Sequence, residues 1–197
     1  MTVRLVLATR NAHKQREFAR LLPEHEIEAL PEAVALPPET GDTFADNALP
    51  KARAAAAATG QPAIADDSGI AAAALDGAPG VRSARYAGPD ATDAENLDRL
   101  RREVPAGSPL AYVCALAFVD PGTGEERVFE GRCTGIMAAA PRGSGGFGYD
   151  PVFVADEGDG GRTMAELGAA EKDAVSHRGR AARALAGWLA REREVAG

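Results

Sequence analysis

Two adjacent carboxylates stand directly after a short apolar run, where residues 66–69 (DDSG) follow residues 63–65 (AIA). Acids that interrupt an apolar strand pattern cost free energy unless a cation or a hydrogen-bond donor compensates them. Paired carboxylates can ligate a hard divalent cation, and Mg²⁺ typically takes one or two carboxylates while phosphates and waters fill its remaining positions. Taken alone, the short, turn-like segment favours an Asx-turn that exposes its acids to solvent.

A second candidate site lies near the N-terminus, where residues 9–14 (TRNAHK) join an apolar run to a helical pattern. The free N–H groups and the dipole at a helix N-terminus favour anions, and Lys14 adds a full positive charge in the first turn. The segment lacks the glycines of a Walker A loop or of a dinucleotide fingerprint. It therefore predicts either a phosphate site or a plain turn between a strand and a helix.

A glycine-rich loop, residues 141–151, contains two aromatic rings and an acid in the segment 147–150 (FGYD). Aromatic rings can stack on a base, and a carboxylate can accept hydrogen bonds from ring N–H groups. The alternative is a structural loop that two aromatic anchors hold in place. Residues 176–179 (SHRG) similarly suit either ligand recognition or a helix N-cap with solvated basic side chains.

Two enzyme classes are excluded by motifs that the chain lacks. Its three histidines include no i, i+4 pair of the kind found on zinc-binding helices. No GxSxG elbow supports a serine hydrolase of the α/β-hydrolase type.

The elements that must position these residues follow from apolar periodicity and from turn residues. The patterns predict strands over 3–8, 26–30, 63–65, 110–119 and 127–137, and helices over 14–22, over 43–59, from residue 92 and after residue 176. Gly60 suits a helix C-cap, whereas Pro50 inside the second helix predicts a kink or a later helix start. Strands alternate with helices in the first half and a hairpin fills the middle, which predicts a mixed α/β fold with a central sheet. No composition shift divides residues 1–197, so we expect a single domain.

Composition limits the partners and the compartment. The 22 basic and 29 acidic residues give a net charge of −7, which argues against a protein that coats nucleic acid polymers. No apolar run approaches the roughly 18 residues that a membrane span needs, and the first residues do not form a signal peptide. Cys114 and Cys133 lack metal-site spacing and are too few for a disulfide framework, so we expect reduced core thiols and a cytoplasmic protein.

Five segments in this order resemble the dITP/XTP pyrophosphatase family, whose members hydrolyse noncanonical purine nucleoside triphosphates to the monophosphate and pyrophosphate. The matching segments are LATRNAHKQREF, ETGDTFADNALPKA, PAIADDSGI with LDGAPGVRSARYAG, GSGGFGYDPVF, and AELGAAEKDAVSHRGRA. Together they span nearly the whole chain. The resemblance implies an elongated, inosine triphosphatase-like α/β fold with two lobes around an active-site cleft, a homodimer and a Mg²⁺-dependent reaction.

The resemblance also implies roles for individual residues. Asp67 is implied as the general base and as a metal ligand, Glu39 as the second metal ligand, and Lys51 as a catalytic cation beside the triphosphate. The implied substrate contacts are Thr9, Arg10, Asn11, Ala12, His13, Lys14, Ser68, Phe147, Gly148, Tyr149, Asp150, Lys172, His177 and Arg178.

These roles lead to a specific hypothesis, in which water attacks the α-phosphorus with metal assistance and pyrophosphate leaves. Selectivity is expected at the purine 6-position, where inosine and xanthosine present a carbonyl to the donors Lys172, His177 and Arg178. Two alternatives are a Maf-like pyrophosphatase acting on pyrimidine triphosphates and a non-catalytic nucleotide- or RNA-binding module. The hypothesis expects a small nucleotide as substrate and neither a nucleic acid polymer nor a membrane as partner.

Overall fold

The computed structural model describes residues 2–158 and 160–195. Its internal contacts divide the chain into two compact units, each assembled from separate segments. Unit 1 comprises Met1–Asp67, Cys114–Gly131 and Arg178–Gly197, and unit 2 comprises Ser68–Val113 and Arg132–His177. Two of the four boundaries therefore fall directly after Asp67 and directly before Arg178, two residues that the sequence singled out.

The strands are β1 (Arg4–Leu7), β2 (Glu26–Ala29), β3 (Ala63–Ala72), β4 (Pro109–Asp120), β5 (Glu125–Met137) and β6 (Phe153–Ala155). Within the described part of the chain they form one six-stranded sheet in the order β2-β1-β3-β4-β5-β6. β1 pairs in parallel with β2 and β3, whereas β6 pairs antiparallel with β5. β4 and β5 are neighbours joined by only four residues, which confirms the predicted hairpin.

The helices are α1 (Ala12–Leu21), α2 (Phe44–Thr59), α3 (Asp93–Glu103), α4 (Ala169–Val175) and α5 (His177–Val195). Gly60 caps α2 in the left-handed conformation, with φ 66°, as predicted. Pro50 lies inside α2, and the helix continues on both sides of it, so the expected late start was wrong. No helix in the described residues combines the length and the apolar character that crossing a membrane requires.

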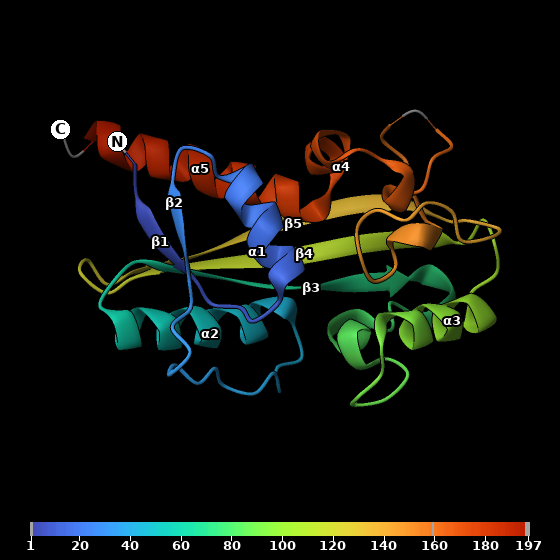
Figure 1. The fold of residues 1–197 in the computed structure, drawn as a ribbon, viewed down its shortest axis with the longest axis horizontal. Helices are drawn as coiled ribbons and strands as arrows, with labels where there is room; N and C mark the ends of the chain where they lie inside the picture. The colour runs from blue at the N-terminus through green and yellow to red at the C-terminus, as the bar shows by residue number, and fades with distance from the viewer. Residues whose placement is uncertain (1, 159, 196–197) are drawn as a thin grey trace. The chain divides into compact units, whose positions relative to one another are not determined.

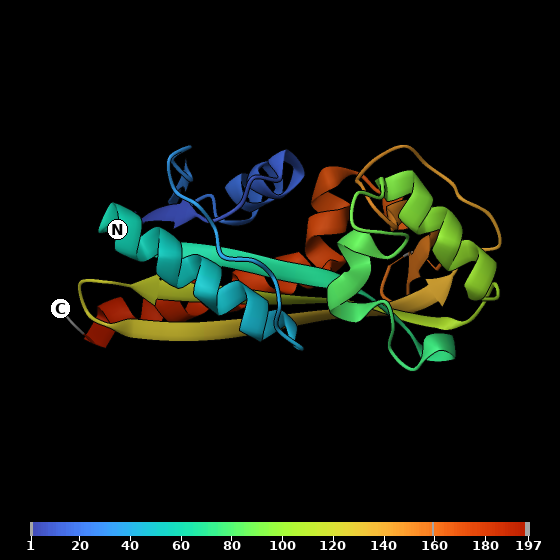
Figure 2. The ribbon, with the colours of Figure 1, turned by 90° about the horizontal axis from the view of Figure 1, so that it is seen from below.

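Unit 1 has two apolar cores on opposite faces of its strands, because successive strand side chains point to opposite faces. Leu7 and Ile64 belong to the core that includes side chains of α1 and α5. Val6 and Ala65 belong to the core that includes the alanine-rich face of α2. Figure 1 shows α1 and α5 on one side of β1 and β3 and α2 on the other, and Figure 2 shows α2 lying along β3.

Among its described residues, unit 2 has one core, in which Ile70 of β3 and Leu100 of α3 pack with Tyr112, Met137 and Phe153. Cys133 is buried in this core, and Cys114 is buried in unit 1. Neither cysteine forms a disulfide, which confirms the expected core thiols.

The parallel strands of unit 1 determine where its polar residues gather. β1 ends at Leu7, whose partner on β3 is Ile64, and β3 continues beyond that pair. The loops after β1 and β2 therefore leave the sheet at the edge where β3 carries Asp66 and Asp67. Ligands of open α/β sheets bind beyond the carboxyl ends of parallel strands, so this edge is the expected place for a site.

Candidate active site

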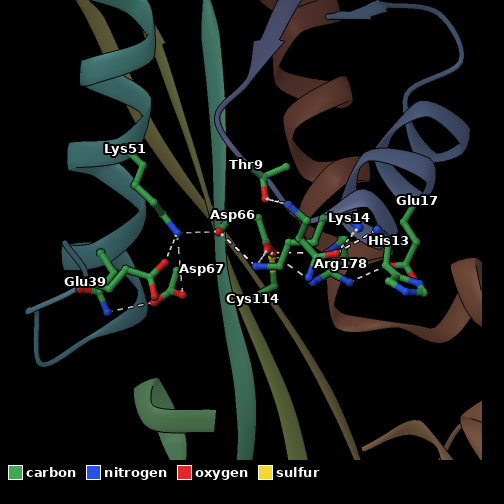
Figure 3. A network of polar contacts seen from close by, with 12 residues as sticks. Thr9, His13, Lys14, Glu17, Glu39, Lys51, Asp66, Asp67, Cys114 and Arg178 are labelled. Atoms are coloured by element: carbon green, nitrogen blue, oxygen red, sulfur yellow. Dashed lines mark hydrogen bonds and ion pairs between the residues drawn. The ribbon is translucent and has the colours of Figure 1, made fainter. Parts of the chain in front are cut away.

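Asp66 and Asp67 lie within β3 and not in a turn after it, so the Asx-turn interpretation was wrong. Their side chains point to opposite faces of the strand because they are adjacent in sequence. Asp66 is 1% exposed and Asp67 is 6% exposed. Figure 3 shows the two carboxylates on opposite sides of β3, each within its own polar network. Burial on this scale requires compensation, which the two networks supply differently.

The Asp66 carboxylate is surrounded by donors. Arg178 approaches with Nε and with a terminal nitrogen, each 3.4 Å from a carboxylate oxygen. Lys14 forms an ion pair with the same carboxylate, and Cys114 Sγ donates to Asp66 Oδ2 at 3.0 Å. Arg178 also pairs with the buried Glu17 of α1. Two acids and two cations therefore form a charge-balanced cluster on the α1 and α5 face.

This compensation decides the protonation state of Asp66. Burial raises the pKa of the Asp66 carboxyl, but the charges of Arg178 and Lys14 and the bonds from Cys114 and Lys14 outweigh it, so the pKa lies well below its ordinary value. Burial raises the pKa of the Cys114 thiol, and the negative charge of Asp66 raises it further. Asp66 is thus a stable carboxylate and Cys114 a stable thiol.

The Asp67 network contains fewer donors. Asn47 of α2 donates from Nδ2 to Asp67 Oδ2 at 3.0 Å. The Lys51 ammonium lies 3.9 Å from Asp67 Oδ1 but only 2.6 Å from Glu39 Oε1, so Glu39 is its closer carboxylate partner. Two acids therefore share one ammonium on this face of β3.

Asp67 consequently resists ionisation. Burial raises the pKa of its carboxyl, the nearby Glu39 raises it as well, and Lys51 and Asn47 lower it only in part, so the pKa lies above its ordinary value. A carboxylate with a raised pKa in a polar cluster is suited to accept a proton.

The two lysines meet at a single backbone atom. Lys51 Nζ donates to the Asp66 carbonyl oxygen at 3.0 Å, and Lys14 Nζ donates to the same oxygen at 3.4 Å. Figure 3 shows these two ammonium groups reaching the carbonyl from opposite sides of the strand. Two ammonium groups, each also paired with carboxylates, are therefore held at one carbonyl of β3.

The predicted phosphate loop precedes α1 as expected. Asn11 caps the helix, and its Oδ1 accepts from the N–H groups of His13 and Lys14. Thr9 is buried and its Oγ1 accepts from the Asn11 N–H at 3.1 Å, whereas Ala12 and His13 are exposed at the helix start. The loop is therefore ordered by its own side chains at the edge of the sheet.

Arg10 reaches away from this loop. Its guanidinium donates to the backbone carbonyls of Leu30, Pro31, Glu32 and Val34 at 2.8–3.2 Å. It thus fastens the segment that follows β2, and a contact from Arg10 to substrate stays a prediction.

Unit 2 holds the second group of predicted residues around Asp150, which is 3% exposed. Lys172 Nζ donates to Asp150 Oδ2 at 2.7 Å, and the Phe147 N–H donates to the same oxygen at 2.9 Å. The Tyr112 hydroxyl donates to Asp150 Oδ1 at 3.1 Å. Asp150 therefore orders the loop that contains it and holds the Lys172 ammonium.

The two aromatic residues of this loop differ in their surroundings. Tyr149 is 6% exposed and its hydroxyl donates to the Ser83 carbonyl at 2.7 Å, so this ring is an anchor as in the structural alternative. Phe147 is half-buried, and Lys172 Nζ lies 5.2 Å from its ring centroid. Phe147 remains the candidate for stacking on a base, and Gly148 beside it has φ 61°.

His177 and Arg178 at the start of α5 are buried, so the expectation of solvated basic side chains was wrong, whereas Ser176 does directly precede the helix. His177 belongs to unit 2, where its ring stacks on Tyr112 with centroids 4.6 Å apart. Arg178 belongs to unit 1 and pairs with Asp66 and Glu17, so its contact with a base stays a prediction. Ser68, the first residue of unit 2, is half-buried in β3.

Four residues of these networks were not assigned to the site from the sequence, namely Glu17, Asn47, Tyr112 and Cys114. Glu17 and Arg178 are 161 positions apart, so no local sequence pattern could predict that they pair. Asn47 gave a weak signal, because it lies four residues before Lys51 and so on the same helix face.

Comparison with known proteins identifies the family to which the chain belongs. The model of the Ham1 family matches residues 5–188. The chain belongs to the Ham1 family.

Relatives and solved structures agree with this assignment. The dITP/XTP pyrophosphatase of Frankia alni is 50% identical over 201 residues, covering 95% of this chain and 97% of the relative. The dITP/XTP pyrophosphatase of Streptomyces coelicolor is 48% identical over 194 residues, covering 92% and 94%.

Two solved structures share the fold. A HAM1 protein from Coxiella burnetii is 41% identical, with a TM-score of 0.83 over 96% of this chain and 100% of that chain. The nucleoside-triphosphatase, or dITP/XTP pyrophosphatase, from Mycobacterium abscessus is 47% identical, with a TM-score of 0.69 over 94% and 98%. The predicted mixed α/β sheet flanked by helices is confirmed, while the two lobes and the cleft stay a prediction.

Proposed function

We propose that this protein hydrolyses noncanonical purine nucleoside triphosphates, such as dITP, ITP, XTP and dXTP, to the monophosphate and pyrophosphate. The names of relatives about half identical in sequence support this activity. The observation that carries it is the carboxylate of Asp67, whose pKa is raised, beside the Lys14 and Lys51 ammonium groups that share one carbonyl. A base next to two cations suits hydrolysis of a phosphoanhydride, in which water loses a proton and charge develops on phosphate oxygens.

The residues fit a magnesium ion. The Glu39 and Asp67 carboxylates converge on one cation, the Lys51 ammonium, so their oxygens can face a common positive charge. The described residues contain no cluster of three or more His, Cys, Asp or Glu side chains with metal-site geometry. Two carboxylates suffice for Mg²⁺ when phosphates and waters complete its shell. We propose that Glu39 and Asp67 hold Mg²⁺, which when bound neutralises charge on the phosphate oxygens.

The remaining steps belong to side chains of unit 1. The loop of residues 9–14 and the N-terminus of α1 bind phosphate oxygens, and Lys14 and Lys51 neutralise their charge. Asp67 orients a water molecule towards the α-phosphorus and takes its proton. The new P–O bond forms as the bond to the β-phosphate oxygen breaks, and pyrophosphate leaves.

Unit 2 supplies candidates for recognition of the base. Lys172 and His177 are donors, and Phe147 offers a ring face beside the Lys172 ammonium. Hypoxanthine and xanthine present a 6-carbonyl acceptor, whereas the 6-amino group of adenine would oppose these donors. A site that leaves buried donors unpaired can discriminate by about 10⁴–10⁵ in kcat/KM.

The deciding experiment measures pyrophosphate release from dITP, XTP, dGTP, dATP and dTTP with and without Mg²⁺. We expect release from dITP and XTP only with the metal, and an Asp67→Asn loss of about 10²–10⁴ in rate. Asp120→Asn is the matched control, because Asp120 is the last residue of β4 and its side chain accepts from the Gly122 N–H of the hairpin turn.

Other outcomes identify the alternatives. A preference for dTTP would indicate a Maf-like pyrophosphatase, and nucleotide binding without pyrophosphate release would indicate a binding module. An Asp67→Asn protein that folds and retains normal turnover would remove Asp67 from the mechanism.

We further propose a cytoplasmic homodimer. The two unlinked thiols fit a reducing compartment, and the resemblance to the family supports the dimer. Sedimentation equilibrium tests the assembly, since a monomer mass of 20.4 kDa at micromolar concentration would contradict it.

A further inference from the structure

Asn47 connects two parts of the Asp67 network. It is 3% exposed and occupies the fourth helical position after Thr43, the N-cap of α2. Its Oδ1 accepts from the Gly41 N–H at 2.7 Å, and its Nδ2 donates to Asp67 Oδ2 at 3.0 Å. One amide group therefore bonds both to the loop that carries Glu39 and to the acid on β3.

The chemistry of the two partners fixes the orientation of this amide. A backbone N–H can only donate, so the carbonyl oxygen of Asn47 must face Gly41. The NH₂ group must then face Asp67. Because Asn47 takes Oδ2, the other oxygen of Asp67 is the one that lies 3.9 Å from Lys51 Nζ.

The Glu39 loop also lies directly against Asn47. A Cβ added at Gly41 would be 2.9 Å from Asn47 Oδ1 and 2.5 Å from the Cβ of Asp46, which is closer than real Cβ contacts. Only glycine fits at this approach. The missing side chain of Gly41 therefore allows the close approach at which its N–H bonds to Asn47.

We propose that Asn47 is a positioning residue, whose amide sets the orientation of the Asp67 carboxylate and holds the Glu39 loop beside it. The expected effect of Asn47 on turnover rests on the proposed function. Asn47 does not touch the reacting atoms. It acts through Asp67, so its removal lowers turnover only while Asp67 is present.

Unit 2 provides an internal control. Asn96 occupies the fourth position of α3 after the N-cap Thr92, and it is 2% exposed. Its Oδ1 accepts from the Ala87 N–H at 2.7 Å, and its Nδ2 donates to the Ala84 carbonyl at 3.1 Å. Both helices begin with the pattern Thr-x-x-acid-Asn, but the partners of Asn96 are backbone groups only.

The matched substitutions are Asn47→Asp and Asn96→Asp. Each substitution retains the oxygen that accepts from a backbone N–H. Each replaces the NH₂ donor with a carboxylate oxygen that faces the oxygen of the former acceptor, so both variants should lose stability for the same reason. Asn47→Asp in addition repels Asp67. We expect kcat for dITP to fall about 10²-fold, the effect of a misplaced catalytic group, with a smaller change in KM. We expect Asn96→Asp to leave kcat near the wild-type value, and equal losses of kcat in both variants would overturn the proposal.

A double substitution tests whether Asn47 acts through Asp67. Asn47→Ala should lower kcat in the wild-type background and cause no further loss in an Asp67→Asn background. If Asn47→Ala instead lowers kcat by the same factor in both backgrounds, Asn47 acts independently of Asp67, which contradicts the inference.

Amide hydrogen exchange at Gly41 provides a measurement without substrate. We expect strong protection in the wild-type and Asn96→Asp proteins and fast exchange in Asn47→Ala. Protection that persists in Asn47→Ala would overturn the link between Asn47 and the loop. If the wild-type protein releases no pyrophosphate from dITP, the proposed function fails, and the exchange result still reports on the link.

Discussion

Two neighbouring carboxylates of β3 have opposite environments on the two faces of the strand. On the α1 and α5 face, Asp66 receives two cations and a thiol, and its pKa is held well below its ordinary value. On the α2 face, Asp67 receives one amide and a distant share of the Lys51 ammonium, and its pKa is raised. Both side chains are buried, so burial alone does not distinguish them.

The difference lies in how completely each charge is compensated. Arg178 and Lys14 pair with Asp66 and leave it a fixed structural anion. Lys51 lies closer to Glu39 than to Asp67, so Asp67 retains a tendency to take up a proton. Full compensation favours a structural role and partial compensation favours chemistry.

The largest expected effect on stability follows from removing the charge of Asp66, the fully compensated carboxylate. Asp66→Asn removes the carboxylate that pairs with Lys14 and with the buried Arg178, and the unfolding free energy should fall by about 3–5 kcal/mol. Urea unfolding of Asp66→Asn beside Asp67→Asn measures this loss. Equal unfolding free energies for the two variants would show that the faces do not differ as described.

The pH dependence of stability should separate the same two acids. A depressed native pKa means that Asp66 stabilises the fold above its unfolded pKa of about 3.9, and that this contribution is lost as pH falls through the native pKa. We therefore expect the wild-type unfolding free energy to decline in acid more steeply than that of Asp66→Asn. Parallel curves for the two proteins between pH 7 and the acid limit would contradict the depressed pKa.

Asp67→Asn should have a smaller effect of the opposite sign. A raised native pKa means that ionised Asp67 destabilises the fold at neutral pH, so neutralising it should raise the unfolding free energy by about 0.5–2 kcal/mol. The gain should vanish below pH of about 3.9, where the carboxyl is protonated in both states. A variant that is inactive and also less stable at pH 7 would argue for a structural role of Asp67.

The fold was largely predictable because its signals are local. Apolar periodicity, the Thr92 capping box and the glycine at the end of α2 each depend on a few consecutive residues. Two local expectations failed where tertiary context overrode them. β3 continues through both acids because side chains from other elements compensate their charges, and α2 tolerates Pro50 inside the helix.

The site was predictable only in part. Asp67 and Lys51 were expected together, and the structure brings them near one another with Glu39. The different roles of Asp66 and Asp67 were not predictable from the sequence. They depend on Arg178 and Cys114, which lie 112 and 48 positions further along the chain than Asp66. Tyr149 shows the same limit, because only its bond to the Ser83 carbonyl identifies it as an anchor.

The smallest expected effect tests the neutral member of the Asp66 cluster. Cys114 Sγ donates to Asp66 Oδ2, and its pKa is raised by burial and by the charge of Asp66. We therefore expect no alkylation of Cys114 by iodoacetamide in the folded protein and complete alkylation after urea unfolding. Mass spectrometry of the peptide that contains Cys114 measures both states.

Substitution of this thiol should leave the chemistry intact. Cys114→Ser keeps a donor, whereas Cys114→Ala removes one of several partners of Asp66 and should lower the unfolding free energy by about 0.5–1.5 kcal/mol. Cys133→Ala is the control, because this buried thiol belongs to the core of unit 2. Because Arg178 and Lys14 still hold Asp66, pyrophosphate release should not change. A folded Cys114→Ala protein without activity would mean that the Asp66 carboxylate itself is needed for catalysis, and the contrast between the two carboxylates would fail.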